Sequence, residues 1–101
     1  MQASVHTDGA KAAIKLAGRF DFNTHRDFRS VCDPLIVDAN VREIVIDFDS
    51  VDYLDSSALG MLLMLRDKVG GAGKNVLLTG VRGNVKQVLD IANFSKLFKI
   101  S

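Results

Sequence analysis

Three consecutive polar residues, Asp55, Ser56 and Ser57, directly precede a strongly apolar segment and are the residues best placed to do chemistry. Asp55 is expected to cap a helix, because its carboxylate can accept the backbone N–H of residue 57 or 58 and its charge suits the positive end of the helix dipole. Ser56 would then lie on the first helical turn, exposed and outside the cap role. The alternative interpretation is that Ser56 and Ser57 are simply further capping residues.

The other residues that often serve in catalysis predict no enzyme. The glycine-rich run at residues 70–74 follows a helix and precedes a strand, whereas a phosphate-binding loop follows a strand and precedes a helix. His6 and His25 have no acidic or thiol neighbour at triad or ligand spacing. Cys32 falls within a helical segment, where a cysteine is more often a small core hydrophobe than a nucleophile. We therefore expect no catalytic residue, no metal and no cofactor.

The segment after Asp55 predicts a helix with more apolar surface than contact with one sheet requires. The residues expected to face the sheet recur every three or four positions: Ala58, Leu62, Leu65 and Val69. Leu63 and Met64 lie well off that stripe. Either a neighbouring helix covers them, or they form a partly exposed apolar patch beside Ser56 that marks a partner surface. Methionine suits an adaptable interface of this kind.

Alternating strand and helix patterns along the chain predict the elements that position this segment. Strands are expected at residues 2–7, 11–17, 42–48, 75–79 and 97–100. Helices are expected at residues 23–38 and 55–69, and a third is expected to begin with Asn84 as its cap. The order β-β-α-β-α-β-α-β implies βαβ crossovers. We therefore expect one α/β domain over residues 1–101, with a mostly parallel central sheet and helices packed against it.

Glycine, proline and connecting residues define the expected boundaries. Asp8-Gly9 predicts a hairpin between the first two strands, and Gly18 is expected to begin a turn. Pro34 lies inside the first helical pattern and predicts a kink or a break. The run at residues 42–48 is nearly continuously apolar, which is typical of a central strand covered on both faces. Residues 53–54 are expected to end a short connector.

Composition indicates a small globular protein. Of 101 residues, 48% are hydrophobic and 25% charged, which argues against disorder. The 13 basic and 12 acidic residues give a net charge of +1, so no nucleic-acid partner is expected. No apolar stretch approaches the ~20 residues of a membrane span, and the N-terminus does not resemble a signal peptide. With a single cysteine, a cytoplasmic protein without membrane contact is expected.

Four segments, in the expected order over nearly the whole chain, resemble the STAS-domain anti-sigma factor antagonists. They are the turn at 18–21, the strand 44–48 with the following 51–60, the strand 76–79, and 85–91 running into 97–100. The element Asp55-Ser56-Ser57-Ala58-Leu59-Gly60 is the specific one. The resemblance implies a STAS-type fold, although the sequence stops at Ser101, where many members continue into an extra C-terminal helix.

The resemblance also implies a function, that of a bacterial phosphoprotein in a partner switch that regulates transcription. Ser56 matches the serine that a partner kinase, commonly the anti-sigma factor itself, phosphorylates in this family. The unphosphorylated antagonist binds this serine kinase/anti-sigma factor and relieves its inhibition, whereas phosphorylation causes release. A metal-dependent serine phosphatase removes the phosphate from the serine. The free protein is expected to be a monomer.

The expected partner surface surrounds Ser56. Asp55 would position the serine, and Asp21, in the matching turn of the family pattern, is expected at the same sheet edge. Phe22 would be an apolar anchor there, or equally a core residue. Further contacts are expected along the helix, from Ser57, Gly60, Leu63 and Met64.

Two alternatives stay within the same fold. One is a partner switch whose output is secretion, biofilm formation or motility rather than a sigma factor. The other is a structural STAS subunit of a transporter that acts without phosphorylation.

Overall fold

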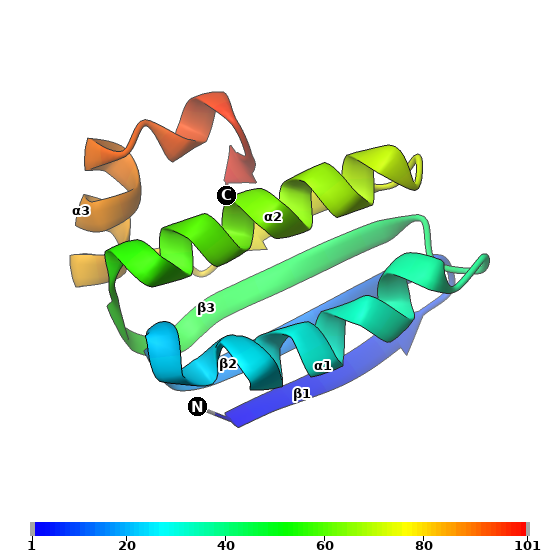
Figure 1. Ribbon diagram of the computed structural model, residues 1–101, viewed down its shortest axis with the longest axis horizontal. Coiled ribbons are helices and arrows are strands. Elements are labelled where there is room, and N and C mark those ends of the chain that lie inside the picture. The colour runs from blue at the N-terminus through cyan, green and yellow to red at the C-terminus, as the bar shows by residue number, and fades with distance from the viewer. Residues whose placement is uncertain (1, 101) are drawn as a thin grey trace.

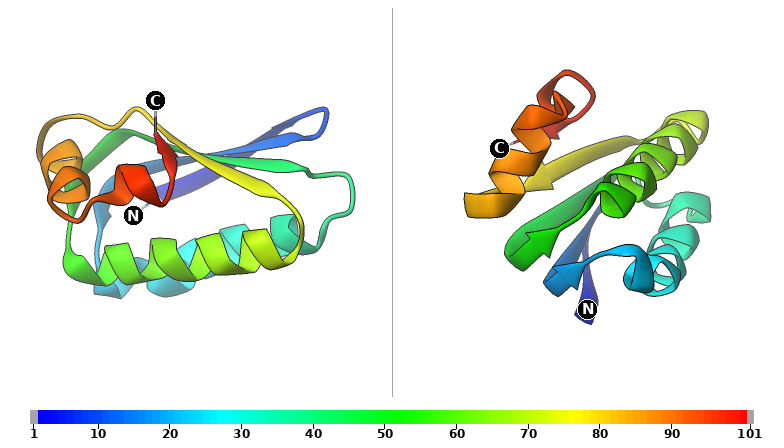
Figure 2. Two further views of the ribbon diagram at one scale, coloured as in Figure 1. Left: turned by 90° about the horizontal axis from the view of Figure 1, so that it is seen from above. Right: turned by 60° about the vertical axis from the view of Figure 1, so that its left-hand side comes forward.

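A five-stranded sheet forms one layer of the computed structural model and helices form the other; the structure describes residues 2–100 (Figures 1 and 2). The strands are β1 (Gln2–Asp8), β2 (Lys11–Phe20), β3 (Glu43–Leu54), β4 (Asn75–Thr79) and β5 (Lys99–Ile100). The helices are α1 (His25–Val37), α2 (Ser56–Gly71) and α3 (Gly83–Ile91), with short 3-10 turns η1 (Phe22–Thr24) and η2 (Phe94–Lys96). The predicted α/β architecture is confirmed.

The five strands lie side by side in sequence order, from β1 to β5. β1 and β2 form the predicted antiparallel hairpin, and every other neighbouring pair is parallel. The last strand begins at Lys99 rather than at the predicted Leu97, because η2 occupies the residues before it. α1 and α2 run in the same direction, since each returns along the sheet from the end of one parallel strand toward the start of the next (Figure 1).

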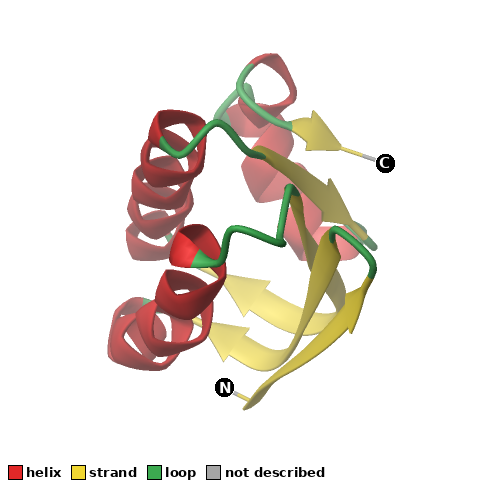
Figure 3. Cartoon of the chain, turned by 90° about the vertical axis from the view of Figure 1, so that its right-hand side faces the viewer, coloured by secondary structure: helices red, strands yellow, loops and turns green. Residues whose placement is uncertain are grey.

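α1 and α2 lie against one face of the sheet, and the opposite face carries no helix within residues 2–100 (Figure 3). The prediction that the strand at 42–48 is covered on both faces is therefore wrong. Its apolar run has another cause. Val45 points to the helix-free face but is only 8% exposed, because Ala13 and Leu77 flank it in the neighbouring strands.

β3 extends past Phe48, where its expected pattern ends, to Leu54. Register shifts against β2 interrupt the strand in this stretch, so that its buried residues fall at every third position, at Phe48, Val51 and Leu54. The period of two is lost there, which made residues 49–54 resemble a connector. β2 likewise continues through Gly18, which adopts a φ of +94° that glycine tolerates, so the predicted turn begins only at Asp21.

The helix boundaries differ from prediction at three points. α1 runs unbroken through Pro34, which lies in its last turn; because proline has no N–H, the Ser30 carbonyl lacks its helical hydrogen bond. α2 continues to Gly71, past the expected end at residue 69. Asn84 does not cap α3, because the helix already begins at Gly83, with Arg82 as its N-cap.

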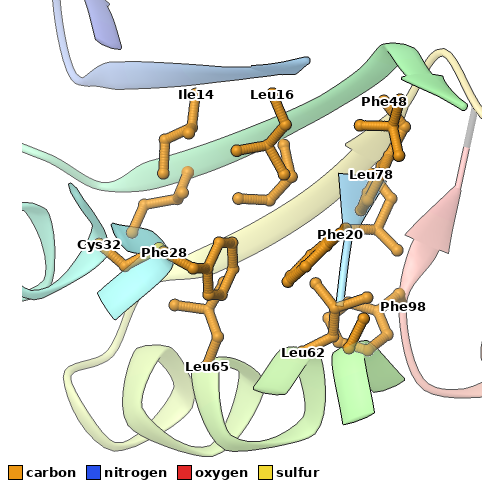
Figure 4. Close-up of a cluster of buried hydrophobic side chains, with 14 of the residues drawn as sticks. Ile14, Leu16, Phe20, Phe28, Cys32, Phe48, Leu62, Leu65, Leu78 and Phe98 are labelled. Carbon is orange, nitrogen blue, oxygen red and sulfur yellow. The ribbon is translucent and has the colours of Figure 1, made fainter. Parts of the chain in front are cut away.

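The core lies between the sheet and the helices (Figure 4). The predicted stripe of α2 faces it, since its four residues are all buried: Ala58, Leu62, Leu65 and Val69. Aromatic side chains fill the centre, with the rings of Phe20 and Phe28 at a centroid distance of 4.8 Å. Cys32 is 2% exposed among them, as expected for a small core hydrophobe. This packing fixes α2, and hence its N-terminus, relative to the sheet.

Leu62 is fully buried in the core. Leu62→Ala is expected to lower the free energy of unfolding by ~2–5 kcal/mol, because the lost methyl groups leave a cavity in a close-packed core. Met64→Ala, on the same helix but at a side chain that is 55% exposed, should cost less than about 1 kcal/mol. Urea titration followed by circular dichroism measures both changes. Equal losses in the two variants would contradict the packing described here.

Candidate functional site

Two aspartate-capped helical turns start side by side at the edge of the sheet where β2 and β3 end. The two strands pair in parallel up to Phe20 and Leu54, and the Asp55 N–H donates to the Phe20 carbonyl at 3.3 Å. The residues that follow the strands, Asp21 and Asp55, therefore lie at the same edge. The sequence prediction for the position of Asp21 is confirmed in this respect.

Asp55 is the N-cap of α2. Its Oδ1 accepts the Ala58 N–H at 3.0 Å while its own backbone is extended. Neither serine is the cap: Ser56 is exposed on the first turn and Ser57 is half-buried behind it. The hydroxyl of Ser56 is thus presented at the helix N-terminus, where backbone N–H groups and the helix dipole favour negative charge.

Asp21 closes a capping box at the start of η1. Its Oδ1 accepts the Asn23 N–H at 3.0 Å, and its own backbone N–H donates to the hydroxyl oxygen of the buried Thr24 at 3.1 Å. The Thr24 hydroxyl in turn donates to the Asp21 carbonyl at 2.7 Å. This compact turn holds Phe22 outward, where it is 65% exposed and stacks on His25 at a centroid distance of 5.7 Å. The core interpretation of Phe22 is therefore wrong, and its ring is available at the surface.

Arg19 and Tyr53, which the sequence analysis did not select, form a second pair at this edge. They are register partners, and the Arg19 guanidinium lies 4.1 Å from the centre of the Tyr53 ring. Arg19 Nε also lies 3.6 Å from Asp21 Oδ2. A signal existed in the sequence, because residues 19–21 and 53–55 share one pattern: a large polar residue, an apolar one and an aspartate.

The other predicted contact residues lie along α2 at different depths. Gly60 is exposed, with open space where a side chain would point. Leu63 is half-buried against the core, whereas Met64 is 55% exposed. The structure therefore separates the two residues: Leu63 is partly buried against the core, whereas Met64 is exposed on the surface of α2.

The chain matches the family model of the STAS domain over residues 2–101. It belongs to the STAS family. A STAS-domain containing protein of Pseudomonas aeruginosa (strain UCBPP-PA14) is 45% identical over 94 residues, which cover 93% of this chain and 91% of the relative. An anti-sigma-B factor antagonist of Staphylococcus aureus is 23% identical over 88 residues, which cover 87% of this chain and 81% of that protein.

Solved structures share the fold of this STAS domain. An anti-sigma factor antagonist from Mycobacterium paratuberculosis matches with a TM-score of 0.82 at 21% identity, over 98% of this chain and 83% of that one. The Bacillus antagonist SpoIIAA matches with a TM-score of 0.76 in both its unphosphorylated and its phosphorylated form, at 17% and 16% identity, over 99% of this chain and 87% and 91% of those chains. A sulfate transporter family protein from Wolinella succinogenes matches with a TM-score of 0.77 at 16% identity. The match covers 90% of this chain and 75% of that one.

Within residues 2–100, no three histidine, cysteine or acidic side chains are grouped to hold a metal ion. Over the same residues, no helix is long and apolar enough to cross a membrane. Burial, with a smaller contribution from the Asp33 carboxylate, raises the pKa of the Cys32 thiol from its ordinary 9.0 to about 12, so the thiolate that a nucleophile needs is absent at neutral pH.

Removal of the Asp55 cap in Asp55→Ala is expected to lower the free energy of unfolding by about 1 kcal/mol, because the Ala58 N–H loses its acceptor. Asp55→Asn keeps a capping oxygen and should retain most of that stability. Urea unfolding curves of the three proteins measure the difference. If the asparagine variant lost as much as the alanine variant, a cap hydrogen bond would not be the stabilising interaction.

The raised pKa of Cys32 predicts how this thiol reacts. At pH 8 the folded protein should not react with an aromatic disulfide reagent, whereas the urea-unfolded chain should release one equivalent of thiolate. Because the pKa is higher in the folded state, the stability that the buried thiol contributes is full below about pH 9 and is lost as the pH rises toward 12. Rapid labelling of the native protein would show that the thiol is accessible after all.

Proposed function

We propose that this STAS domain is a cytoplasmic anti-sigma factor antagonist that works as a partner switch. In its unphosphorylated form it binds a serine kinase that is also the anti-sigma factor, and so relieves the inhibition that this kinase exerts. Phosphorylation of Ser56 causes release, and a metal-dependent serine phosphatase restores the binding form. The observation that carries the proposal is the exposed hydroxyl of Ser56, set on the first turn of α2 beside the Asp55 cap. Membership of the STAS family and the antagonist among its relatives support it.

The fold is expected to accept a phosphoryl group on Ser56 without rearranging. The group adds about −1.5 to −2 charge at neutral pH. The N-terminus of α2 favours this charge, whereas the neighbouring carboxylate of Asp55 opposes it. The cap itself is made by Asp55 and not by the serine, so modification removes no hydrogen bond that starts the helix. The phosphorylated form of SpoIIAA shares the fold of this chain, as does the unphosphorylated form, which is in keeping with this expectation.

Binding to the partner is expected to change much more than the fold. A partner that covers the edge formed by Asp21, Asp55 and Ser56 must exclude water from it. Once Ser56 is phosphorylated, the same contact buries a dianion and its bulk, which is costly unless a cation compensates. Phe22 supplies an exposed apolar anchor at this edge, and hot spots of interfaces commonly involve such aromatic side chains. Ser57, Gly60, Leu63 and Met64 extend the proposed surface along α2.

Phosphorylation at Ser56 is the first test. Protein purified from its native cell, or incubated with ATP and the serine kinases of that cell, should carry one phosphate, located on Ser56 by tandem mass spectrometry and removed by a serine phosphatase. Ser56→Ala should abolish it, and Ser57→Ala, at the neighbouring half-buried hydroxyl, should not. In a titration with the same kinase, Ser56→Asp should bind at least ten times more weakly than Ser56→Ala, because the kinase must then desolvate a charge.

Two results would contradict the proposed switch. One is tight binding of Ser56→Asp, equal to that of the alanine variant. The other is a chain that no kinase of the cell modifies. That second result would favour the alternative of an unphosphorylated transporter subunit, the setting suggested by the sulfate transporter family protein with the same fold.

A further inference from the structure

A narrow apolar hollow opens between α1 and α2. One end of it reaches His25, the residue that stacks on Phe22 at the Ser56 edge. Figure 1 shows the two helices side by side along their length, and the hollow lies in the seam between them. Its walls are almost entirely apolar and come from both helices: Phe28, Cys32, Ile36, Met61, Met64 and Leu65. We call this the seam hollow. Phe28, Cys32 and Leu65 form its buried floor, and the exposed Met64 stands at its mouth.

The size of the seam hollow limits what it can hold. Its volume is about 80 Å³. An apolar cavity of ~150 Å³ holds a benzene ring, so the seam hollow suits one aliphatic side chain such as leucine rather than a drug-sized ligand. Two methionines line it, and methionine adapts its shape to an incoming group. The side chains that contribute most to a protein interface lie in well-packed pockets from which water is excluded.

The surface around the seam hollow continues it toward the far end of the helices. A second, shallower hollow lies along the same seam and is bordered by Ile36 and by Val37, which is 82% exposed. Among the ion pairs of residues 2–100, the one between Lys68 Nζ and Asp33 Oδ1, 3.6 Å apart, joins α2 to α1 where the two hollows meet. Its two side chains are 41% and 49% exposed, so the pair contributes at most about 1 kcal/mol and can rearrange when a partner binds.

The charge at the rim indicates the chemistry of the partner. Lys68 and Asp33 neutralise one another, whereas Arg29 has no acidic side chain within ion-pair distance among residues 2–100. The rim is therefore left with one uncompensated positive charge beside an apolar hole. An acidic segment with an apolar side chain directed into the hole complements both features. Two helices in one layer also leave a groove between them into which a third helix packs.

We infer that the seam between α1 and α2 binds an acidic amphipathic helix of a protein partner, with a leucine-sized side chain in the seam hollow and a carboxylate at Arg29. The identity of this partner with the one that contacts Ser56 rests on the proposed function. The recognition of an acidic helix by the seam does not depend on that function. Met61 and Met64 line the seam hollow five and eight residues after Ser56, which is roughly 8 to 12 Å along the axis of α2. This separation is about one Debye length or more at physiological salt, so a phosphoryl group on Ser56 acts only weakly on the charge at the rim. The seam is therefore expected to keep most of its affinity for the helix when Ser56 is phosphorylated.

The first experiment needs no kinase. The probe is a synthetic helical peptide with leucines at i, i+4 spacing and flanking glutamates, titrated into protein with labelled methionine methyl groups. Met61 and Met64 methyl signals should shift, and Arg29→Glu should weaken binding about tenfold, because it places like charge at the rim. Arg26→Glu is the matched control, since Arg26 is an exposed arginine of α1 that does not line the hollow. A peptide with alanine for leucine, or lysine for glutamate, should not bind.

Three results of the peptide experiment would contradict the proposed helix-binding seam. Absence of methyl shifts, equal binding of the lysine peptide, or equal effects of Arg29→Glu and Arg26→Glu would each overturn the inference. The second experiment combines Arg29→Glu with Ser56→Ala and with Ser56→Asp against the kinase that phosphorylates Ser56. The seam variant should weaken kinase binding by the same factor in both backgrounds, since distant sites add independently. An unequal factor would overturn the claim of independence, whereas a failure of phosphorylation alone would contradict the proposed function and leave the peptide result standing.

Discussion

The parallel pairing of β2 with β3 is the interaction on which the rest of the structure depends. It aligns Phe20 with Leu54, so that both strands end at the same edge of the sheet. The residue that follows each strand is an aspartate, Asp21 after β2 and Asp55 after β3. A slip of one residue would turn every side chain of a strand to the other face. Phe20 would then leave the core, and the two aspartates would no longer start their helical turns side by side. The same pairing thus fixes the packing of the centre and the geometry of the candidate site.

Much of this arrangement follows from sequence patterns that depend on simple physical rules. The four buried residues of α2 lie where a period of 3.6 places them, and Asp55 caps the helix because a carboxylate accepts the first-turn N–H groups well. The end of β3 was not predictable in this way, because register shifts replace alternation with buried residues at every third position. Whether Phe22 faced the core or the solvent depended on the backbone geometry of the local turn that Asp21 and Thr24 close, and the residue types alone do not determine that geometry.

α2 combines two surfaces that differ in how they respond to charge. Its N-terminus presents a hydroxyl and a carboxylate in water, where added negative charge changes the electrostatic field within a few ångströms. Farther along, Met61, Met64 and Leu65 contribute to an apolar seam, where a contact is governed by shape and by the removal of apolar area from water. Under the two proposals made above, a single element would provide one contact that depends on modification and another that depends on it much less, because salt screens charge over the length of the helix.

The identity of the capping residue decides whether such a switch disturbs the fold. If Ser56 itself capped α2, its hydroxyl would be engaged by the backbone, and modification would remove a hydrogen bond that helps to start the helix. With Asp55 as the cap, one residue earlier, the helix start is made by a side chain that modification does not touch, and the serine hydroxyl projects into water. A phosphoryl group on the serine then weakens the binding of a partner that covers it, whereas the stability of the domain itself changes little. An aspartate followed by an exposed serine at a helix start therefore separates the stability of the domain from the affinity of its complex.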